Sequence, residues 1–345
     1  MTSFAKKYFI QQYMQENYLH GGVGFADAEK ILMSLGFQPV SFPYHHSFSL
    51  TAKLVRSLFL FKMLFAIKKD SVVIFLFPLY ARMNLLLLKW LSNKNVKIIC
   101  YIADIDGIKD GDENLLRKEI SFFKRFKYFV VHSERMNGWL QKNVPGDRHA
   151  VMIRFFDFLA KPFQAQRHLS FNVVFAGNLA KSLFLEKLYL LNKAEPSLHF
   201  HLYGPGESNG MIAQDNVTGN GTEEPHTLPV KLKGSFGLIW EGDSIDKLSG
   251  SLGHYIEYIT HHKLSLYILA GLPIIVAASA ASASLIKEYK IGFTIESLYE
   301  IEEKIKAVSE TDYQEMRANM KPLADKISKG DFLKSAIDEL MELFV

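Results

Sequence analysis

The stretch "HHKLSLYILAGLPIIVAA", residues 261–278, joins a helix-like run to a strand-like run through Gly-Leu-Pro. The apolar residues before Gly271 predict a helix, and glycine is the residue that most often ends a helix in the left-handed conformation. The β-branched run Ile274 to Val276 predicts a short buried strand within residues 272–277. A helix that leads directly into a buried strand is the repeating unit of α/β proteins with parallel sheets.

The same alternation continues through most of the chain. Short runs rich in β-branched and aromatic residues are separated by segments with helical character, which implies parallel sheets built from βαβ units with helices on both faces. We therefore predict an α/β fold. The predicted strands are 37–42, 71–77, 96–103, 128–133, 149–156, 171–177, 198–204, 235–240, 272–277 and 292–295.

The length of 345 residues is enough for two domains that each bury a core. The segment "FDFLAKPFQAQRHLSFN" (156–172) lies between two series of strands and shows no clear period, so we place the boundary near 157–170. We expect domains at 1–160 and 161–310, with C-terminal helices at 311–345 that pack back on the first domain. Two doubly wound domains facing each other would place the carboxyl ends of both sheets at one cleft, where ligands usually bind.

Composition narrows the class of protein. Hydrophobic residues make up 48% and charged residues 22% of the chain, which indicates a globular protein, and a net charge of +4 argues against a nucleic-acid binder. The single cysteine, Cys100, lies in an apolar run, so no disulfide is expected and a reducing compartment fits.

The N-terminus lacks the continuous apolar run of a signal peptide. The apolar stretches 72–91 and 268–286 are interrupted by charges or by glycine and proline, so they fit core segments of a cytoplasmic protein.

Two lysines lie where predicted strands and helices meet. In "FAGNLAKSLFLEKL" (175–188) a buried strand runs into Gly177 and Asn178, and a helix is expected to carry Lys181 in its first turns. Backbone amides and an ammonium group at one sheet edge suit an anionic ligand, although a plain turn with a solvated lysine is the alternative. Lys263 begins the helix of residues 263–271, where a positive charge is unfavourable unless an anion balances it.

Histidines and glycines provide further candidates. His261 and His262 are adjacent, so they face different directions and do not form a zinc pair; His262 could equally be a packed histidine. In "HGGVGFADAEKIL" (20–32), Gly21, Gly22 and Gly24 precede an amphipathic helix. We predict no strand before them, and the third glycine of a dinucleotide fingerprint is replaced, which argues against NAD. The loop could hold a phosphate or an acceptor hydroxyl, or be a capped turn.

The ordered set "FAGNLAKSLF", "FHLYGPG", "GSFGLIWEGD" and "YIEYITHHKLSLYILAGLPIIV" resembles a bacterial glycosyltransferase family over residues 171–300. This family contains the glucosyltransferases of serine-rich-repeat adhesins and β-1,6-galactofuranosyltransferases. "VKIICYIADIDGIK" and "YFVVHSERM" resemble its N-terminal domain more weakly. The resemblance implies the GT-B fold: two Rossmann-like domains, the first binding the acceptor and the second the nucleotide sugar. It also implies a UDP-sugar as donor and no metal or other cofactor.

The resemblance also suggests roles for individual residues. Lys181 stands where the family has a basic residue after Gly-Asn, near the diphosphate, and Lys263 matches a lysine that meets the same group. Tyr255 matches an aromatic position, and His262 replaces a tyrosine, so its role stays open. Two lysines and two helix N-termini suit a diphosphate whose charge grows as the sugar leaves. The expected donor-binding residues are Gly177, Asn178, Lys181, Tyr255, His262 and Lys263, and the expected acceptor-binding residues are Gly21, Gly22 and Gly24.

The motif "ADID" (103–106) allows two chemical interpretations. Asp-x-Asp after a strand can hold a divalent cation, because side chains at i and i+2 of an extended segment share a face. The resemblance to the glycosyltransferase family instead implies that the acidic position after this strand faces the acceptor, which would make Asp104 the general base. A turn or helix cap formed by Asp104 and Asp106 is the third possibility.

Two basic, aromatic-rich segments, 51–70 and 119–129, lie in the expected acceptor domain. Such surfaces attach proteins to anionic membranes, although core helices with solvated basic rims would show the same pattern.

The resemblance and these segments together predict a cytoplasmic, peripherally membrane-bound transferase. It would move galactofuranose or glucose from a UDP-sugar to a glycan, which a lipid could carry. A non-catalytic partner that binds glycan or stabilises a transferase is the alternative. The sugar, the linkage and a homo-oligomeric state are left open.

Overall fold

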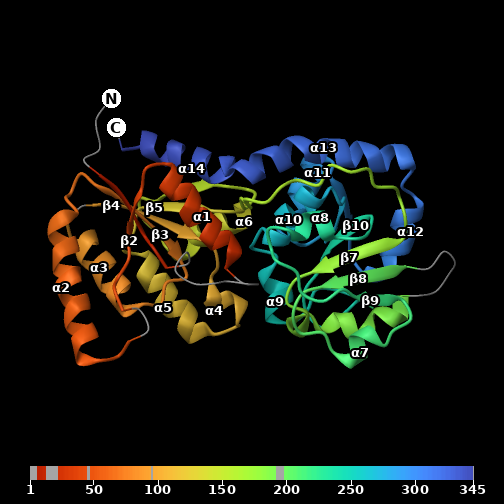
Figure 1. Ribbon diagram of the computed structural model, residues 1–345, viewed down its shortest axis with the longest axis horizontal. Helices are drawn as coiled ribbons and strands as arrows, with labels where there is room; N and C mark the ends of the chain where they lie inside the picture. Colours follow the sequence, from red (N-terminus) through yellow and green to blue (C-terminus); the bar gives the residue numbers. More distant parts are fainter. Residues whose placement is uncertain (1–5, 13–21, 45–46, 95, 192–197, 345) are drawn as a thin grey trace.

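The computed structural model describes residues 6–12, 22–44, 47–94, 96–191 and 198–344 (Figure 1). They form two six-stranded sheets with helices around them, and the neighbouring strands in both sheets pair in parallel. The predicted α/β fold with two doubly wound parallel sheets is thus confirmed.

The N-terminal sheet has the order β2-β1-β3-β4-β5-β6. Its central strand β3 is buried along its whole length, and its residues alternate between two core clusters, with Phe75 in one and Ile74 in the other. The strands are β1 (Lys7–Ile10), β2 (Gln38–Val40), β3 (Val72–Phe77), β4 (Lys97–Ile102), β5 (Tyr128–Val131) and β6 (His149–Met152). The helices between them are α1 (Val23–Ser34), α2 (Leu50–Ala66), α3 (Arg82–Ser92), α4 (Asp106–Lys109), α5 (Glu113–Phe123) and α6 (Glu134–Asn143).

The C-terminal sheet has the order β12-β11-β10-β7-β8-β9. Its strands are β7 (Asn172–Ala176), β8 (His199–Tyr203), β9 (Val217–Gly219), β10 (Phe236–Ile239), β11 (Ile274–Ala277) and β12 (Gly292–Ile295). The α-helices are α7 (Asn209–Ile212), α8 (Leu228–Lys231), α9 (Gly250–Tyr255), α10 (His262–Ala270), α11 (Ala283–Tyr289), α12 (Ile301–Lys306), α13 (Glu310–Lys329) and α14 (Asp331–Glu342). The 3-10 segments of the described residues are η1 (Leu179–Lys181), η2 (Leu183–Leu191) and η3 (Leu298–Glu300).

The opening stretch folds as predicted. Helix α10 ends at Gly271, which has the left-handed φ of 63°, and β11 follows directly. Every residue of α10 from Leu264 to Ala270 is buried, so this helix is held by packing on both sides. Its N-terminus therefore has a fixed position at the carboxyl edge of the sheet.

Other local predictions were wrong. Strands β1 and β9 were missed, and β1 precedes the glycine loop where no strand was expected. Strand β1 begins with lysine and is followed by Gln11 and Gln12, so its apolar run is only the three residues from Tyr8 to Ile10. The helix expected after Gly177-Asn178 is 3-10 rather than α. The strand expected at 149–156 ends at Met152.

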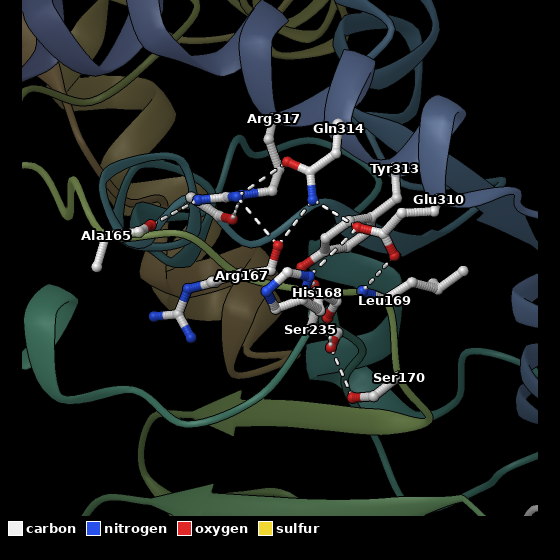
Figure 2. A network of polar contacts seen from close by, with 11 residues as sticks. Ala165, Arg167, His168, Leu169, Ser170, Ser235, Glu310, Tyr313, Gln314 and Arg317 are labelled. Atoms are coloured by element: carbon white, nitrogen blue, oxygen red, sulfur yellow. Dashed lines mark hydrogen bonds and ion pairs between the residues drawn. The ribbon is translucent and has the colours of Figure 1, made fainter.

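The linker between the two sheets is held by the long helix α13 (Figure 2). Arg317 donates hydrogen bonds to the carbonyls of Ala165 (2.9 Å) and Arg167 (3.2 Å), and Gln314 donates to Arg167 (2.7 Å). The backbone N–H of Leu169 donates to Glu310 at 3.0 Å. These bonds attach the second part of the linker to the C-terminal half.

Helix α14 crosses to the other half and packs against β6 and α1, so α13 and α14 extend along both halves in Figure 1. The carboxylate of Asp157 accepts hydrogen bonds from the N–H groups of Phe332 (3.2 Å) and Leu333 (2.7 Å) at the start of α14. Burial raises the pKa of Asp157 to about 7. Within the described ranges, no helix combines the length and apolar character needed to cross a membrane.

Candidate active site

The candidate site lies between the carboxyl edges of the two sheets. In each sheet the chain reverses its direction of progression at one point, between β1 and β3 in the first and between β7 and β10 in the second. The carboxyl ends at such a point diverge and leave a crevice that ligands can enter. A cavity of about 360 Å³ is lined by residues that follow β1 and β4 and by residues that follow β7 and β10. The two halves therefore build this cavity together.

A second cavity of about 280 Å³ adjoins the first on the side of the C-terminal sheet. Four residues line both cavities: Val23, Asn178, His262 and Lys263. The second cavity extends along the carboxyl ends of β7 and β8, where Gly177 and Tyr203 are part of its wall. A ligand with two linked parts could occupy both spaces at once.

Lys263 lies at the first turn of α10 and is paired inside the protein. Its Nζ lies 2.6 Å from Oε1 of Glu241 and 4.0 Å from the centre of the Phe175 ring. The side chains are 15% and 11% exposed for Lys263 and Glu241, so the pair is largely removed from water. Glu241 therefore supplies, within the protein, the negative charge that we expected a bound ligand to supply. One bond to Glu241 leaves the ammonium group two further donors.

Glu241 was not singled out from the sequence, although a signal for it exists. It follows the buried strand β10 almost directly, in "IWEGD". An acid just beyond the carboxyl end of a strand at the reversal point of a sheet is well placed to line a crevice.

The turn after β7 is shaped by the lysine beside it. A Cβ on Gly177 would lie 2.8 Å from Cε and 3.2 Å from Nζ of Lys263, so a side chain here would displace the lysine. Asn178 follows and lines both cavities. Lys181 is exposed at the end of η1 and lines the larger cavity. Among the described residues Lys181 has no salt-bridge partner, so its charge is available to a ligand.

Asp104 lies on the opposite wall and has a partner for each oxygen. The Tyr255 hydroxyl donates to Oδ1 at 2.9 Å, and Nζ of Lys109 donates to Oδ2 at 2.9 Å. The same tyrosine hydroxyl accepts the backbone N–H of Ile105 at 2.7 Å. Tyr255 is 2% exposed, and its burial beside Asp104 raises the pKa of its phenol well above the ordinary value. Tyr255 lines the cavity, and its hydroxyl donates its hydrogen bond to Asp104 across the interface between the halves.

Lys109 was also missed from the sequence. It lies one helical turn beyond Asp106, at i+3, and its Nζ is 3.9 Å from Oδ1 of Asp106. The ammonium group thus lies between the two carboxylates, in the position that the alternative interpretation reserved for a metal ion. Among the described residues, no three or more His, Cys, Asp or Glu side chains form a group that could hold a metal.

Glu119 holds the turn that carries Asp104 and Lys109. Its two oxygens accept the backbone N–H groups of Asp106 (3.1 Å) and Gly107 (2.9 Å). Burial raises the pKa of Glu119 to about 7. Asp106 is 9% exposed, and burial raises its pKa as well.

The two histidines before Lys263 are held neutral by burial, which lowers the pKa of each to about 4. His262 lies under the start of α1, where a Cβ on Gly24 would be 2.7 Å from its Cδ2. Its Nε2 is buried and has no hydrogen-bond partner among the described residues. His262 therefore contacts the glycine loop as well as both cavities.

The glycine loop is only partly described. Gly22 has a left-handed φ of 79° and caps α1, and both Gly22 and Gly24 line the larger cavity. Gly21 lies outside the described residues.

Helix α1 is tied to the C-terminal half by Asp27, which is fully buried and lies 3.0 Å from Nε2 of His226. The hydrogen bond to Asp27 raises the pKa of His226, which favours a charged imidazolium at this contact.

Two parallel, Rossmann-like sheets with their carboxyl edges at a shared cavity define the GT-B class of glycosyltransferases. The chain belongs to the glucosyltransferase 3-like family: its N-terminal domain model matches residues 6–150 and its C-terminal domain model matches residues 173–340. The predicted family and glycosyltransferase class are thus confirmed.

Individual relatives agree with this assignment. The β-1,6-galactofuranosyltransferase WbbI of Escherichia coli K12 is 25% identical over 295 residues, which cover 84% of this chain and 85% of WbbI. Glucosyltransferase 3 of Streptococcus gordonii is 23% identical over 330 residues, which cover 92% of this chain and 93% of the relative. Among solved structures, Anabaena HepE in complex with UDP and glucose shares the fold, with a TM-score of 0.64, 11% identity, and coverage of 98% of this chain and 99% of HepE. Sucrose-phosphate synthase from Thermosynechococcus elongatus also shares it, with a TM-score of 0.65, 13% identity and coverage of 98% and 99%.

Proposed function

We propose that this glycosyltransferase moves a hexose, galactofuranose or glucose, from a UDP-sugar to a glycan during assembly of a cell-surface polysaccharide or glycoprotein. One observation carries the proposal: a single cavity has Lys181 and Lys263 on its C-terminal wall and the carboxylate of Asp104 on its N-terminal wall. Cations on one side suit a diphosphate, and a carboxylate on the other suits an acceptor hydroxyl. The names of the relatives, a galactofuranosyltransferase and a glucosyltransferase, support these two sugars as the candidates.

In this proposal the diphosphate lies between Lys181, the free donors of Lys263 and the N-terminus of α10. As the bond from the sugar to the diphosphate breaks, negative charge grows on the UDP leaving group, and these donors stabilise it. Gly177 leaves room for Lys263, and Asn178 contacts the ligand from the same turn. The adjoining cavity of about 280 Å³ would take the nucleoside, with His262 on the wall between the two spaces.

On the acceptor side, Asp104 takes the proton of the attacking hydroxyl as general base. Tyr255 and Lys109 each donate a hydrogen bond to one of its oxygens, which leaves a lone pair free on each oxygen to accept the proton. The loop with Gly22 and Gly24 would position the acceptor by backbone contacts. Lys109, Lys181 and Lys263 supply the positive charge of the site, so we propose that transfer requires no metal ion. We also propose that a lipid carries the acceptor glycan, which places the protein at the inner face of the cell membrane.

The test is thermal stabilisation and UDP release with UDP-glucose, UDP-galactofuranose, UDP-galactopyranose and GDP-mannose, in the presence of EDTA. We expect stabilisation and turnover with one of the first two donors. Lys181→Ala should abolish the stabilisation by UDP and leave the ligand-free melting temperature unchanged, since Lys181 is exposed. Lys287→Ala, which removes an exposed lysine from α11, is the matched control.

Two results would overturn the proposal. Absence of binding to every nucleotide would favour the non-catalytic partner that binds glycan or stabilises another transferase. Binding and turnover that return only when a divalent cation replaces EDTA would favour a metal site at Asp104 and Asp106.

A further inference from the structure

Helix α2 presents a continuous apolar surface outside the protein core. Its buried residues, Ala52, Leu60 and Leu64, face inward, and the helix packs on α3. Figure 1 shows α2 at the end of the N-terminal half that lies farthest from the C-terminal half. Five large apolar side chains on its other side are exposed: Leu50 (82%), Leu54 (63%), Leu58 (61%), Phe61 (51%) and Phe65 (81%).

These five residues, which we call the α2 stripe, share one face of the helix. At 3.6 residues per turn, their spacings of four, four, three and four residues keep them within an arc of roughly 80°. Phe48, which is 84% exposed, lies just before the helix and extends the apolar surface. Apolar residues scattered singly on a surface are ordinary, whereas a contiguous exposed stripe along four turns marks a contact surface.

The charges around the α2 stripe indicate what it contacts. Between Glu29 and Asp104 the sequence contains a single acidic residue, Asp70. Lys53 and Lys62 are exposed and fall on either side of the stripe, about 100° and 80° from its centre at ideal helical spacing. The basic residues of the same stretch are Lys30, Lys53, Arg56, Lys62, Lys68, Lys69, Arg82, Lys89, Lys94 and Lys97.

Not every cation of the segment is available. Arg56 donates hydrogen bonds to the carbonyls of Tyr44 (2.6 Å) and Ser47 (2.8 Å), so its charge is already partnered within the protein. The second segment predicted to meet a membrane, 119–129, also differs from α2. Its Phe123 and Phe126 are 0% and 3% exposed and belong to the core, so this segment fits a core helix with a basic rim.

We propose that the α2 stripe docks the protein on an anionic lipid bilayer, with the apolar side chains at the headgroup and acyl boundary and Lys53 and Lys62 on the lipid phosphates. A helix with one apolar face, basic flanks and no acidic residue has the character of an interfacial membrane helix. Long lysine side chains reach from the helix flanks to the headgroups. The inference deepens the proposed function and rests on it in one respect, since a lipid-linked acceptor must be met at a bilayer.

The experiment is cosedimentation of the full chain, without any sugar donor, with vesicles of phosphatidylcholine alone and vesicles that also contain phosphatidylglycerol. The wild type should pellet with the anionic vesicles, and raising the salt concentration should weaken this binding. Leu58→Glu and Phe65→Glu should each lower the partition coefficient about tenfold or more, because each places a charge in the apolar contact. Ile212→Glu, at an apolar side chain of α7 that is 43% exposed, is the matched control and should bind like the wild type.

The two variants should keep the wild-type melting temperature, since both side chains are exposed, and they should retain UDP binding. Equal vesicle binding by the wild type and both variants, or no binding by any protein, would overturn the inference. Conversion of a dimer to a monomer by Leu58→Glu, seen by light scattering, would also overturn it and make the stripe an interface between copies of the chain. The vesicle assay contains no sugar donor, so it tests membrane binding alone. Failure of the proposed sugar transfer would appear in the UDP-release assay and would leave the vesicle result unchanged.

Discussion

The pair of Lys263 and Glu241 allows the structural and the ligand-binding role of one lysine to be separated. Lys263→Met removes the ammonium group from a carboxylate that is only 11% exposed. Breaking a fully buried pair costs about 3–5 kcal/mol, and the residual exposure here lowers the expected loss of unfolding free energy to about 2–4 kcal/mol. The double variant Lys263→Met, Glu241→Gln leaves no unpaired charge, so its stability should return to within about 1 kcal/mol of the wild type.

Donor binding should behave differently in the same variants. If Lys263 also binds the diphosphate, the double variant lacks a charge-assisted hydrogen bond of about 1.5–3 kcal/mol, which corresponds to a rise in the Kd for UDP of roughly 10- to 150-fold. Glu241→Gln alone keeps the lysine and frees it from its internal partner, so its Kd for UDP should not rise. Urea denaturation gives the stabilities and isothermal titration gives the Kd values. A double variant that binds UDP as tightly as the wild type would refute the assignment of Lys263 to the donor.

Three further changes test individual contacts, two at the cavity and one at the start of α14. Tyr255→Phe should lower the unfolding free energy in urea by about 2–4 kcal/mol, because Asp104 and the buried N–H of Ile105 both lose their partner. Gly177→Ala should raise the Kd for UDP about tenfold in isothermal titration, because its methyl group takes the place of the Lys263 side chain. Asp157→Asn should flatten the fall in stability from about pH 4 to about pH 7, since the folded protein holds a proton there that the unfolded chain has released.

The first two of these predictions have a control variant, and the third has a second titrating group to consider. Tyr189→Phe removes the same hydroxyl from a side chain that is 57% exposed and should change stability by less than about 0.5 kcal/mol. Gly36→Ala is the control for Gly177, because a Cβ there meets no atom within 4 Å, although its positive φ adds backbone strain. Glu119 also has a pKa of about 7, so Asp157→Asn should remove only part of the pH dependence. An unchanged pH profile would contradict the assignment of a proton to Asp157.

The site was predictable where a motif and a strand end coincide. Asp104 follows β4, and Gly177 follows β7, so the alternation of strands and helices was enough to place both at the carboxyl edges of parallel sheets. Glu241 has the same relation to β10 and was missed because an acid in a polar turn has no distinctive spacing. Lys109 was missed because its partners become neighbours only when α4 forms.

The sequence by itself determined the α/β class, the family and the helix-to-strand unit ending at Gly271, because periodicity and turn residues act over a few positions of the chain. Only the tertiary structure decided which charges are free. Lys263 is paired with Glu241 and Tyr255 is bonded to Asp104, whereas Lys181 has no salt-bridge partner among the described residues. The first two contacts join residues 22 and 151 positions apart. Such distant pairs form when strands are brought together in a sheet and sheets face each other, which no local pattern of residue types records.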